Sequence, residues 1–157
     1  MTTNDSLAAA LALIPSGCSI ITAGDGKTGT GMLASWVQQA SFDPPHVTVS
    51  VKDGRPIQAI IAESGRFVLN LLGEDPGAMF KHFGAGFGPG EPAFDGVDIS
   101  ENEWGVEPGA AAGSLSCEVR STVQAADHVV YVAEVCSTKA DGGQKPYVHI
   151  RKSGLSY

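Results

Sequence analysis

Residues 46–51 read His-Val-Thr-Val-Ser-Val, and this strict alternation of polar and apolar side chains limits the fold more strongly than any other segment. Successive side chains of an extended strand point to opposite faces, so the three valines share one face and His46, Thr48 and Ser50 share the other. Such a strand is stable only when neighbouring strands pair with it and a core covers its apolar face. The chain must therefore build a sheet with a buried face.

Residues that favour turns are abundant throughout the chain. Its 157 residues include 20 glycines and 9 prolines, and only 17% are charged, which favours short elements joined by turns over a helix bundle. Because 43% of the residues are apolar, a chain of this length can bury a core without disulfides or structural metals. We expect a single domain spanning residues 1–157.

Local patterns predict six or seven strands and three short helices. Two pairs of strands form hairpins, one around the glycine-rich turn at 24–29 and one across residues 125–127. Asp5 or Ser6 is expected to cap the first helix, and residues 84–113 are expected to form a long excursion with little regular structure. This order predicts a closed or nearly closed antiparallel barrel with helical decoration. The predicted strands are 18–23, 30–41, 46–51, 67–72, 114–124, 128–138 and 147–150, and the predicted helices are 7–13, 56–64 and 76–83.

The charge distribution argues against a nucleic-acid partner. The formal net charge is −7, and the ten Lys and Arg residues are spread along the chain with no run longer than residues 151–152. No segment approaches the roughly 18 consecutive apolar residues that a membrane-spanning helix needs. We therefore expect no binding to nucleic acid and no insertion into a membrane.

The cysteines and the beginning of the sequence indicate a cytoplasmic protein. Cys18, Cys117 and Cys136 are odd in number and form no CxxC pair, which argues against a disulfide framework or a zinc site. The apolar stretch at 7–14 is short and follows Asp5 without any Lys or Arg, unlike a secretory signal. These features favour a reducing compartment.

Several motifs that would assign a chemistry are incomplete. Gly26-Lys27-Thr28 lacks the glycine that a P-loop requires five positions earlier, where Ile21 stands. The glycines at 84–88 follow no strand, and Pro89 prevents a helix from beginning there. No GxSxG nucleophile motif occurs. We expect no metal site and no acid–base constellation, because the histidines are isolated in sequence: His46, His82, His128 and His149.

Segments 31–45, 49–55 and 65–71 resemble, in order and spacing, the FMN-binding split barrels of the flavin-reductase-like family. Further phrases resemble the C-terminal flavin-reductase module of cyanobacterial diflavin flavoproteins: Lys-His-Phe at 81–83, Phe-Gly-Pro-Gly-Glu at 87–91, Ala-Asp-His at 126–128, and His-Ile-Arg-Lys-Ser-Gly at 149–154 before Tyr157. The resemblance covers the chain from about Pro15 onward. It implies a mainly β, antiparallel split β-barrel with Greek-key-like connections and a few short helices.

The same resemblance implies how the protein is assembled. It implies a homodimer in which each flavin lies near the subunit interface. Because the sequence begins with its own Met1 and a short helix, we expect a freestanding version without the di-iron and flavodoxin-like modules of the diflavin proteins.

The flavin ring is expected against the small-residue segment 33–36. An isoalloxazine needs an apolar slot and a few main-chain donors, and small side chains allow a planar ring to approach the backbone. Trp36 would flank the ring, although without the resemblance an ordinary core or dimer-interface aromatic is the better interpretation. The cofactor-binding candidates are Leu33, Ala34, Ser35, Trp36, Val37, Ser41, Val51, Lys52, Arg55, Lys81 and Phe83.

The FMN phosphate is expected near Lys52 and Arg55. Both cations follow the best predicted strand and precede a helix at Pro56, whose N-terminal dipole would also favour an anion. Ser35 and Ser41 are candidates for hydroxyl contacts to the phosphate or the ring. The alternative for these cations is a solvated surface turn.

Two further candidates depend mainly on the resemblance. In the family, the Lys-His-Phe region approaches the flavin edge, which implicates Lys81 and Phe83. Lys81 could instead interact with the free carbonyls at its helix end. His128 matches a position that borders the nicotinamide side of the flavin in relatives, and its alternative is a hydrogen-bonding turn residue.

Three hypotheses of function remain open on the sequence. The first is an NAD(P)H:flavin oxidoreductase that uses FMN, or alternatively FAD, and needs no acid–base residue because the cofactor carries the chemistry. The second is an electron carrier with tightly bound FMN that is reduced by a redox protein partner carrying a basic patch, which would suit the acidic chain. The third is a split barrel that binds a deazaflavin, a haem or no cofactor.

Overall fold

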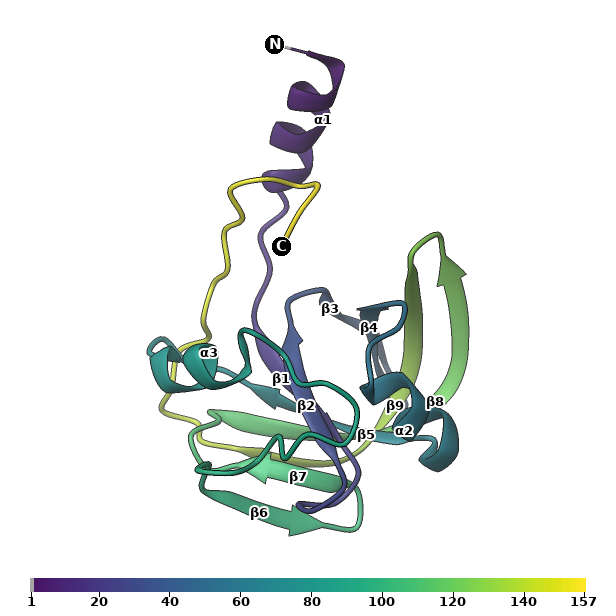
Figure 1. The fold of residues 1–157 in the computed structure, drawn as a ribbon, viewed down its shortest axis with the longest axis vertical. Coiled ribbons are helices and arrows are strands. Elements are labelled where there is room, and N and C mark those ends of the chain that lie inside the picture. The colour runs from purple at the N-terminus through teal and green to yellow at the C-terminus, as the bar shows by residue number, and fades with distance from the viewer. Residues whose placement is uncertain (1) are drawn as a thin grey trace.

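A computed structural model describes residues 2–157 and shows a mainly β protein with three short helices (Figure 1). Seven antiparallel strands form one sheet in the order β2-β1-β5-β8-β9-β4-β3, and β6 and β7 form a small second sheet. The helices are α1 (Thr3–Ala12), α2 (Ile57–Ser64) and α3 (Gly77–Phe83). The strands are β1 (Ser19–Ala23), β2 (Thr30–Ala34), β3 (Val37–Phe42), β4 (Pro45–Lys52), β5 (Arg66–Leu71), β6 (Ile99–Asn102), β7 (Gly105–Pro108), β8 (Gly113–Ala125) and β9 (His128–Ala140).

The strand order forces the sheet to curl into a barrel that stays open along one seam. β2 and β3 are the two edge strands of the seven-stranded sheet, yet only Ser35 and Trp36 separate them in the chain. The two edges must therefore meet, although β2 pairs with β1 and β3 pairs with β4. The result is the split, antiparallel barrel that the sequence predicted.

Two apolar clusters hold this architecture. The first fills the barrel with alternating residues such as Val47, Val49 and Val51 of β4, together with Ile57 and Ile61 of α2. The second lies on the other side of β1, where α3 and the segment after it pack; it consists of Cys18, Ile20, Leu72, Met79, Phe83, Ala93, Phe94 and Val106. The helix α2 closes one end of the barrel and ends at Gly65, which adopts the left-handed conformation with φ +69°.

The strongest local patterns are confirmed. The alternating segment is β4, the late hairpin is β8–β9, and the two predicted internal helices are α2 and α3. The first helix is also present, but it begins at Thr3 and is capped by Thr2 rather than by Asp5 or Ser6. Asp5 instead supplies the carboxylate of a capping box, accepting from the Thr2 N–H at 2.9 Å.

Three predictions of elements are wrong. The strand predicted over 30–41 is interrupted at residues 35–36, because its two halves pair with different partners. The excursion 84–113 contains the hairpin β6–β7, whose turn is held by the Asn102 side chain accepting from the Trp104 N–H at 2.8 Å. Residues 147–150 form no strand, since only isolated bridges, such as Ser16 with His149, occur there.

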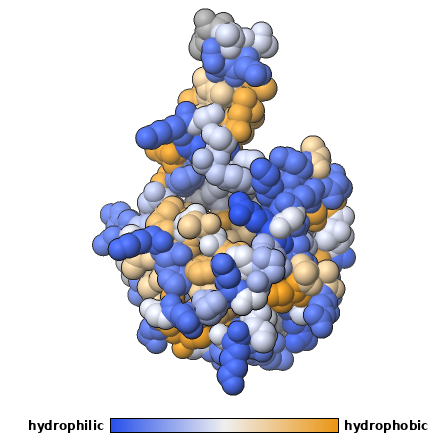
Figure 2. Space-filling view, viewed as in Figure 1, coloured by the Kyte–Doolittle hydropathy of each residue, from blue (hydrophilic) through white to orange (hydrophobic). Residues whose placement is uncertain are grey.

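The helix α1 projects from the barrel together with the end of the chain (Figure 1). We call residues 2–16 and 148–157 the arm. No residue of α1 is buried, and apolar side chains are visible along the arm in Figure 2. The exposed large apolar residues of the arm are Leu7, Leu13, Ile14, Val148, Ile150, Leu155 and Tyr157. No helix within residues 2–157 is long and apolar enough to cross a membrane.

Candidate functional site

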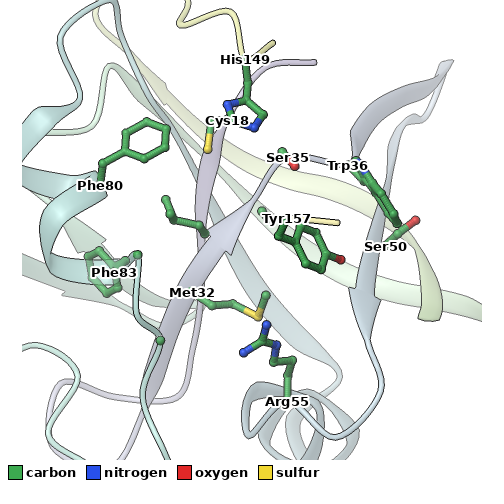
Figure 3. A pocket seen from close by; sticks show the side chains of 14 residues that line it. Cys18, Met32, Ser35, Trp36, Ser50, Arg55, Phe80, Phe83, His149 and Tyr157 are labelled. Carbon is green, nitrogen blue, oxygen red and sulfur yellow. The ribbon is translucent and has the colours of Figure 1, made fainter. Parts of the chain in front are cut away.

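A cavity of about 260 Å³ lies at the seam where the chain passes from β2 to β3 (Figure 3). Ser35 and Trp36 belong to neither strand, and both line the cavity; the Trp36 carbonyl accepts from the Ser50 N–H of β4 at 3.0 Å. The cavity is lined by Cys18, Met32, Leu33, Ala34, Ser35, Trp36, Ser50, Arg55, Phe80, Phe83, Gly84, Gly86, His149 and Tyr157.

The floor of the cavity is apolar because α3 packs tightly on β2. Phe83 is fully buried, and its ring occupies the space that a side chain at Gly31 would need: a Cβ there would lie 2.9 Å from the ring. Phe80 precedes Phe83 by one helical turn and reaches the same cavity. A glycine in β2 thus allows the helix to bring two aromatic rings to one site.

Cys18 lines the cavity as an unreactive, apolar side chain. Burial raises the pKa of its thiol to about 11, so the group is protonated at neutral pH and behaves as a small apolar side chain. Only 6% of Cys18 is exposed.

Arg55 brings a positive charge to the end of the cavity that lies opposite Cys18 (Figure 3). It stands between β4 and α2, where its backbone N–H donates to Gln58 Oε1 at 3.1 Å, and its guanidinium points into the cavity (Figure 3). Within residues 2–157 Arg55 forms no salt bridge. The cation is therefore free to pair with an anionic ligand.

Trp36 is the centre of an aromatic cluster at the mouth of the cavity. The His128 and Tyr157 rings lie 4.7 Å and 5.6 Å from the Trp36 ring, and the Arg151 guanidinium lies 5.2 Å from it. We refer to Trp36, His128, Arg151 and Tyr157 as the Trp36 cluster. It combines flat aromatic surface with positive charge, which suits a planar ligand.

Hydrogen bonds fix the orientation of His128 in this cluster. Its Nδ1 lies 2.8 Å from Asp127 Oδ1, and its Nε2 is hydrogen-bonded to the Tyr157 hydroxyl. The hydrogen bond from His128 lowers the pKa of Asp127, so the carboxylate is ionised and Nδ1 is the donor in that bond. In the neutral imidazole, Nε2 consequently accepts the proton of the Tyr157 hydroxyl. Desolvation raises the pKa of Tyr157, although most of its ring remains exposed.

The structure divides the predicted cofactor residues into two groups. The residues that line the cavity are Leu33, Ala34, Ser35, Trp36, Arg55 and Phe83. The residues that do not line it are Val37, Ser41, Val51, Lys52 and Lys81. His128 stands just behind the lining, against Trp36 and Tyr157.

Each residue of the second group is turned away for a simple physical reason. The side chains of Val51 and Val37 belong to the barrel core. Lys52 shares a face of β4 with Ser50, but it is the exposed last residue of the strand and lies beyond the cavity. The Ser41 hydroxyl donates to the Pro44 carbonyl at 2.7 Å. Lys81 lies on the exposed face of α3.

Several cavity residues were not predicted from the sequence. Phe80 could have been found from its one-turn spacing to Phe83, and Met32 from its place directly before the small-residue segment 33–36. Tyr157 and His149 reach the cavity only because the end of the chain returns to the barrel, which no local pattern signals. The other unpredicted lining residues are Cys18, Ser50, Gly84 and Gly86.

These residues fit a ring system with an anionic tail better than a metal ion. Small-molecule sites are mostly apolar with a few placed polar groups, and here an apolar floor, the break between β2 and β3 at Ser35 and Trp36, and one guanidinium converge. Within the part of the chain that the structure describes, no group of three or more His, Cys, Asp or Glu side chains could hold a metal ion.

Comparison with known proteins agrees with this geometry. The family described as "Flavin reductase like domain" matches residues 11–154. Diflavin flavoprotein A 1 of Synechocystis sp. is 40% identical over 154 residues, which cover 94% of this chain and 26% of the relative. The chain thus spans about a quarter of the length of that curated relative.

Solved structures show the same fold. The styrene monooxygenase flavin reductase from Pseudomonas putida S12 superimposes with a TM-score of 0.77 at 28% identity, covering 94% of this chain and 93% of that one. The NADH:FAD oxidoreductase SgcE6 of Streptomyces globisporus C-1027 gives a TM-score of 0.80 at 24% identity, covering 90% of this chain and 83% of that one. The split barrel, the cavity at its seam and the match along nearly the whole chain agree: this protein belongs to the flavin reductase-like domain family.

Proposed function

We propose that this protein is a flavin oxidoreductase that binds FMN in the seam cavity and accepts a hydride from NADH or NADPH. The observation that carries the proposal is the convergence in one cavity of an apolar floor, the break between β2 and β3 at residues 35–36, and Arg55, which forms no salt bridge within residues 2–157. The bound flavin would supply the hydride chemistry, so the chain itself must bind, orient and shield the reacting rings.

The ring would lie against β2. Leu33 and Ala34 line this part of the cavity with apolar side chains, and the Ser35 backbone N–H would donate to the polar edge of the ring. Phe80 and Phe83 would keep water from the other side. Holding two reactants in a fixed, dry arrangement is the main contribution that a protein can make to direct hydride transfer.

Arg55 would bind the FMN phosphate. Its guanidinium faces the cavity, and the N-terminus of α2 begins two residues later, where unpaired backbone N–H groups favour an anion. Both cations are exposed, but only Arg55 lines the cavity, so we assign the phosphate to Arg55 and not to Lys52.

The nicotinamide would approach from the mouth of the cavity, beside His128. The side chain of His128 is the buried polar group of the Trp36 cluster, with 8% of the residue exposed. It is held by Asp127 at 2.8 Å and so keeps one ring nitrogen directed at the mouth.

The exposed apolar arm suggests that two copies of the chain associate. Leu13 and Ile150 are 81% and 76% exposed, and side chains of this kind are usually covered by a partner. We propose a homodimer in which the arm of each chain packs on the other. A gel-filtration mass of a monomer with flavin bound would contradict it. We also propose a reducing, cytoplasmic location, which suits the unpaired Cys18, Cys117 and Cys136.

An anaerobic absorbance titration tests the proposed activity. The protein is loaded with FMN, and then NADH and NADPH are added separately while the flavin bands are followed. Bleaching supports the oxidoreductase and identifies its donor. If neither nucleotide bleaches the bands but a reduced ferredoxin-like or rubredoxin-like protein does, the chain is an electron carrier instead. Parallel titration with FAD decides between the two flavins.

A further inference from the structure

The last residues of the sequence reach the cavity by a route that barely touches the barrel. We call residues 149–157 the strap. The Gly154 N–H donates to the Ala8 carbonyl at 2.9 Å, and Arg151 Nη2 donates to the Leu11 carbonyl at 3.2 Å, so both bonds tie the strap to α1. A side chain at Gly154 would collide with Leu11, which means that the strap lies directly on the helix.

The strap returns to the barrel through the Trp36 cluster. Arg151 lies over the Trp36 ring, and Tyr157 contacts both Trp36 and His128. Tyr157 is 71% exposed, whereas Ala34 and Phe83 on the cavity floor are 4% and 1% exposed. Tyr157 is therefore the outermost aromatic ring of the site, at the depth where a second ring arriving from solvent would lie.

The hydrogen bond between Tyr157 and His128 uses the one ring nitrogen that could serve a ligand. Because His128 Nδ1 donates to Asp127, Nε2 is the acceptor that remains, and the Tyr157 hydroxyl occupies it. The carboxamide of a nicotinamide carries an N–H₂ donor of the same kind, attached to a flat ring of similar size. Tyr157 and a nicotinamide would compete for the same hydrogen bond and the same surface.

The size of the cavity is consistent with such competition. At about 260 Å³ it lies below the range of roughly 300–1,000 Å³ usual for pockets that hold ligands of this kind. Removing Tyr157 from the mouth would enlarge the cavity without any change in the barrel.

We propose that the strap places Tyr157 in the position of the nicotinamide ring, and that Tyr157 must release His128 before the nicotinamide can bind. This inference rests on the proposed function of the same cavity. Tyr157 is thus a specificity-determining residue: it leaves the deep flavin position accessible and restricts the outer position.

Two substitutions test the proposal. Tyr157→Phe keeps the ring and removes the hydrogen bond, and Tyr157→Ala removes the ring as well. Tyr147→Phe is the matched control, because Tyr147 lies near the same end of the chain and packs on Phe80, outside the cavity lining. Binding of tetrahydro-NADH, a non-reducing analogue, is measured by calorimetry on the FMN-loaded proteins, and FMN affinity is measured separately.

The expected result is tighter binding of the analogue by Tyr157→Phe, by about 2- to 10-fold, because a net hydrogen bond no longer has to be broken. FMN affinity and the control variant should match the unmodified protein. Hydrogen exchange of the strap amides, such as Gly154 N–H, should become faster in flavin-free Tyr157→Phe.

The outcomes separate this inference from the proposed function. Weaker analogue binding by Tyr157→Phe, or a change in FMN affinity alone, overturns the role of Tyr157 and leaves the oxidoreductase intact. If NADH and NADPH reduce neither the unmodified protein nor Tyr157→Ala, the proposed function fails and the inference fails with it. Reduction of the unmodified protein by one nucleotide, with faster reduction of Tyr157→Ala by the same nucleotide, would support both.

Discussion

Replacing Arg55 with alanine should weaken the binding of FMN far more than that of riboflavin. The two ligands share the isoalloxazine and the ribityl chain, and only FMN carries a phosphate. Arg55 faces the cavity and forms no salt bridge within residues 2–157, so its charge is available to that phosphate. The difference between the two ligands therefore isolates one interaction.

The expected magnitude follows from the nature and exposure of the contact. A hydrogen bond to a charged group contributes about 1.5–3 kcal/mol, which corresponds to about a 10- to 150-fold change in affinity. Because Arg55 is an exposed residue, solvent screening places the expected loss near the lower end, at about tenfold. Raising the salt concentration should reduce the difference further.

The assay is fluorescence titration of the flavin, with Lys52→Ala as the matched control. Lys52 is a second cation three positions earlier, and it does not line the cavity. Arg55→Ala should lose FMN affinity, Lys52→Ala should keep it, and riboflavin should bind all three proteins alike. Equal losses for FMN and riboflavin, or equal effects of the two substitutions, would refute the assignment of the phosphate to Arg55.

Four further predictions concern the framework of the site. Gly31→Ala should lower the free energy of unfolding by about 1–3 kcal/mol in a urea titration, because the new Cβ would lie 2.9 Å from the Phe83 ring. An unchanged urea midpoint would contradict the tight packing of α3 on β2. Asn70→Ala should cost about 1–3 kcal/mol in the same assay, since the fully buried amide donates to the Ile20 carbonyl at 3.0 Å, and a neutral effect would mean that water replaces it. In folded protein, iodoacetamide should alkylate the exposed Cys136 well before Cys18, and mass spectrometry of the peptides checks the order. Burial raises the pKa of the Cys18 thiol from 9.0 to about 11, so the thiol ionises at a lower pH in the unfolded chain than in the folded protein. The free energy of unfolding should therefore fall as the pH rises from 9 towards 11. Urea midpoints measured across that range check this.

Much of the barrel could be predicted because its strands are specified locally. The alternation of valines in β4 requires one buried face wherever the strand is placed, and the matched lengths of β8 and β9 around a two-residue turn specify their pairing. The position of Arg55 just before a helix also follows from neighbouring residues alone. These features depend on backbone sterics and side-chain period, which a linear sequence contains.

The partners of each segment were decided only by the tertiary structure. Residues 30–41 carry the composition of one continuous strand, but closing a sheet whose edges are β2 and β3 requires the chain to change partners at Ser35 and Trp36. That change opens the seam and creates the cavity. Lys52 and Arg55 look equivalent in sequence, but only Arg55 lines the cavity, whereas Lys52 ends β4 as an exposed residue outside it.

The residues at the mouth of the cavity, too, were brought together only by the tertiary structure. Tyr157 and His128 are 29 residues apart, and the Tyr157 hydroxyl reaches His128 only because the strap follows α1 back to the barrel. The sequence by itself determined a turn-rich antiparallel protein, with resemblance to flavin reductases along most of its length. Which side chains surround the cavity depended on long-range strand pairing and on the packing of the arm, because contacts between distant segments leave no periodic signal in the chain.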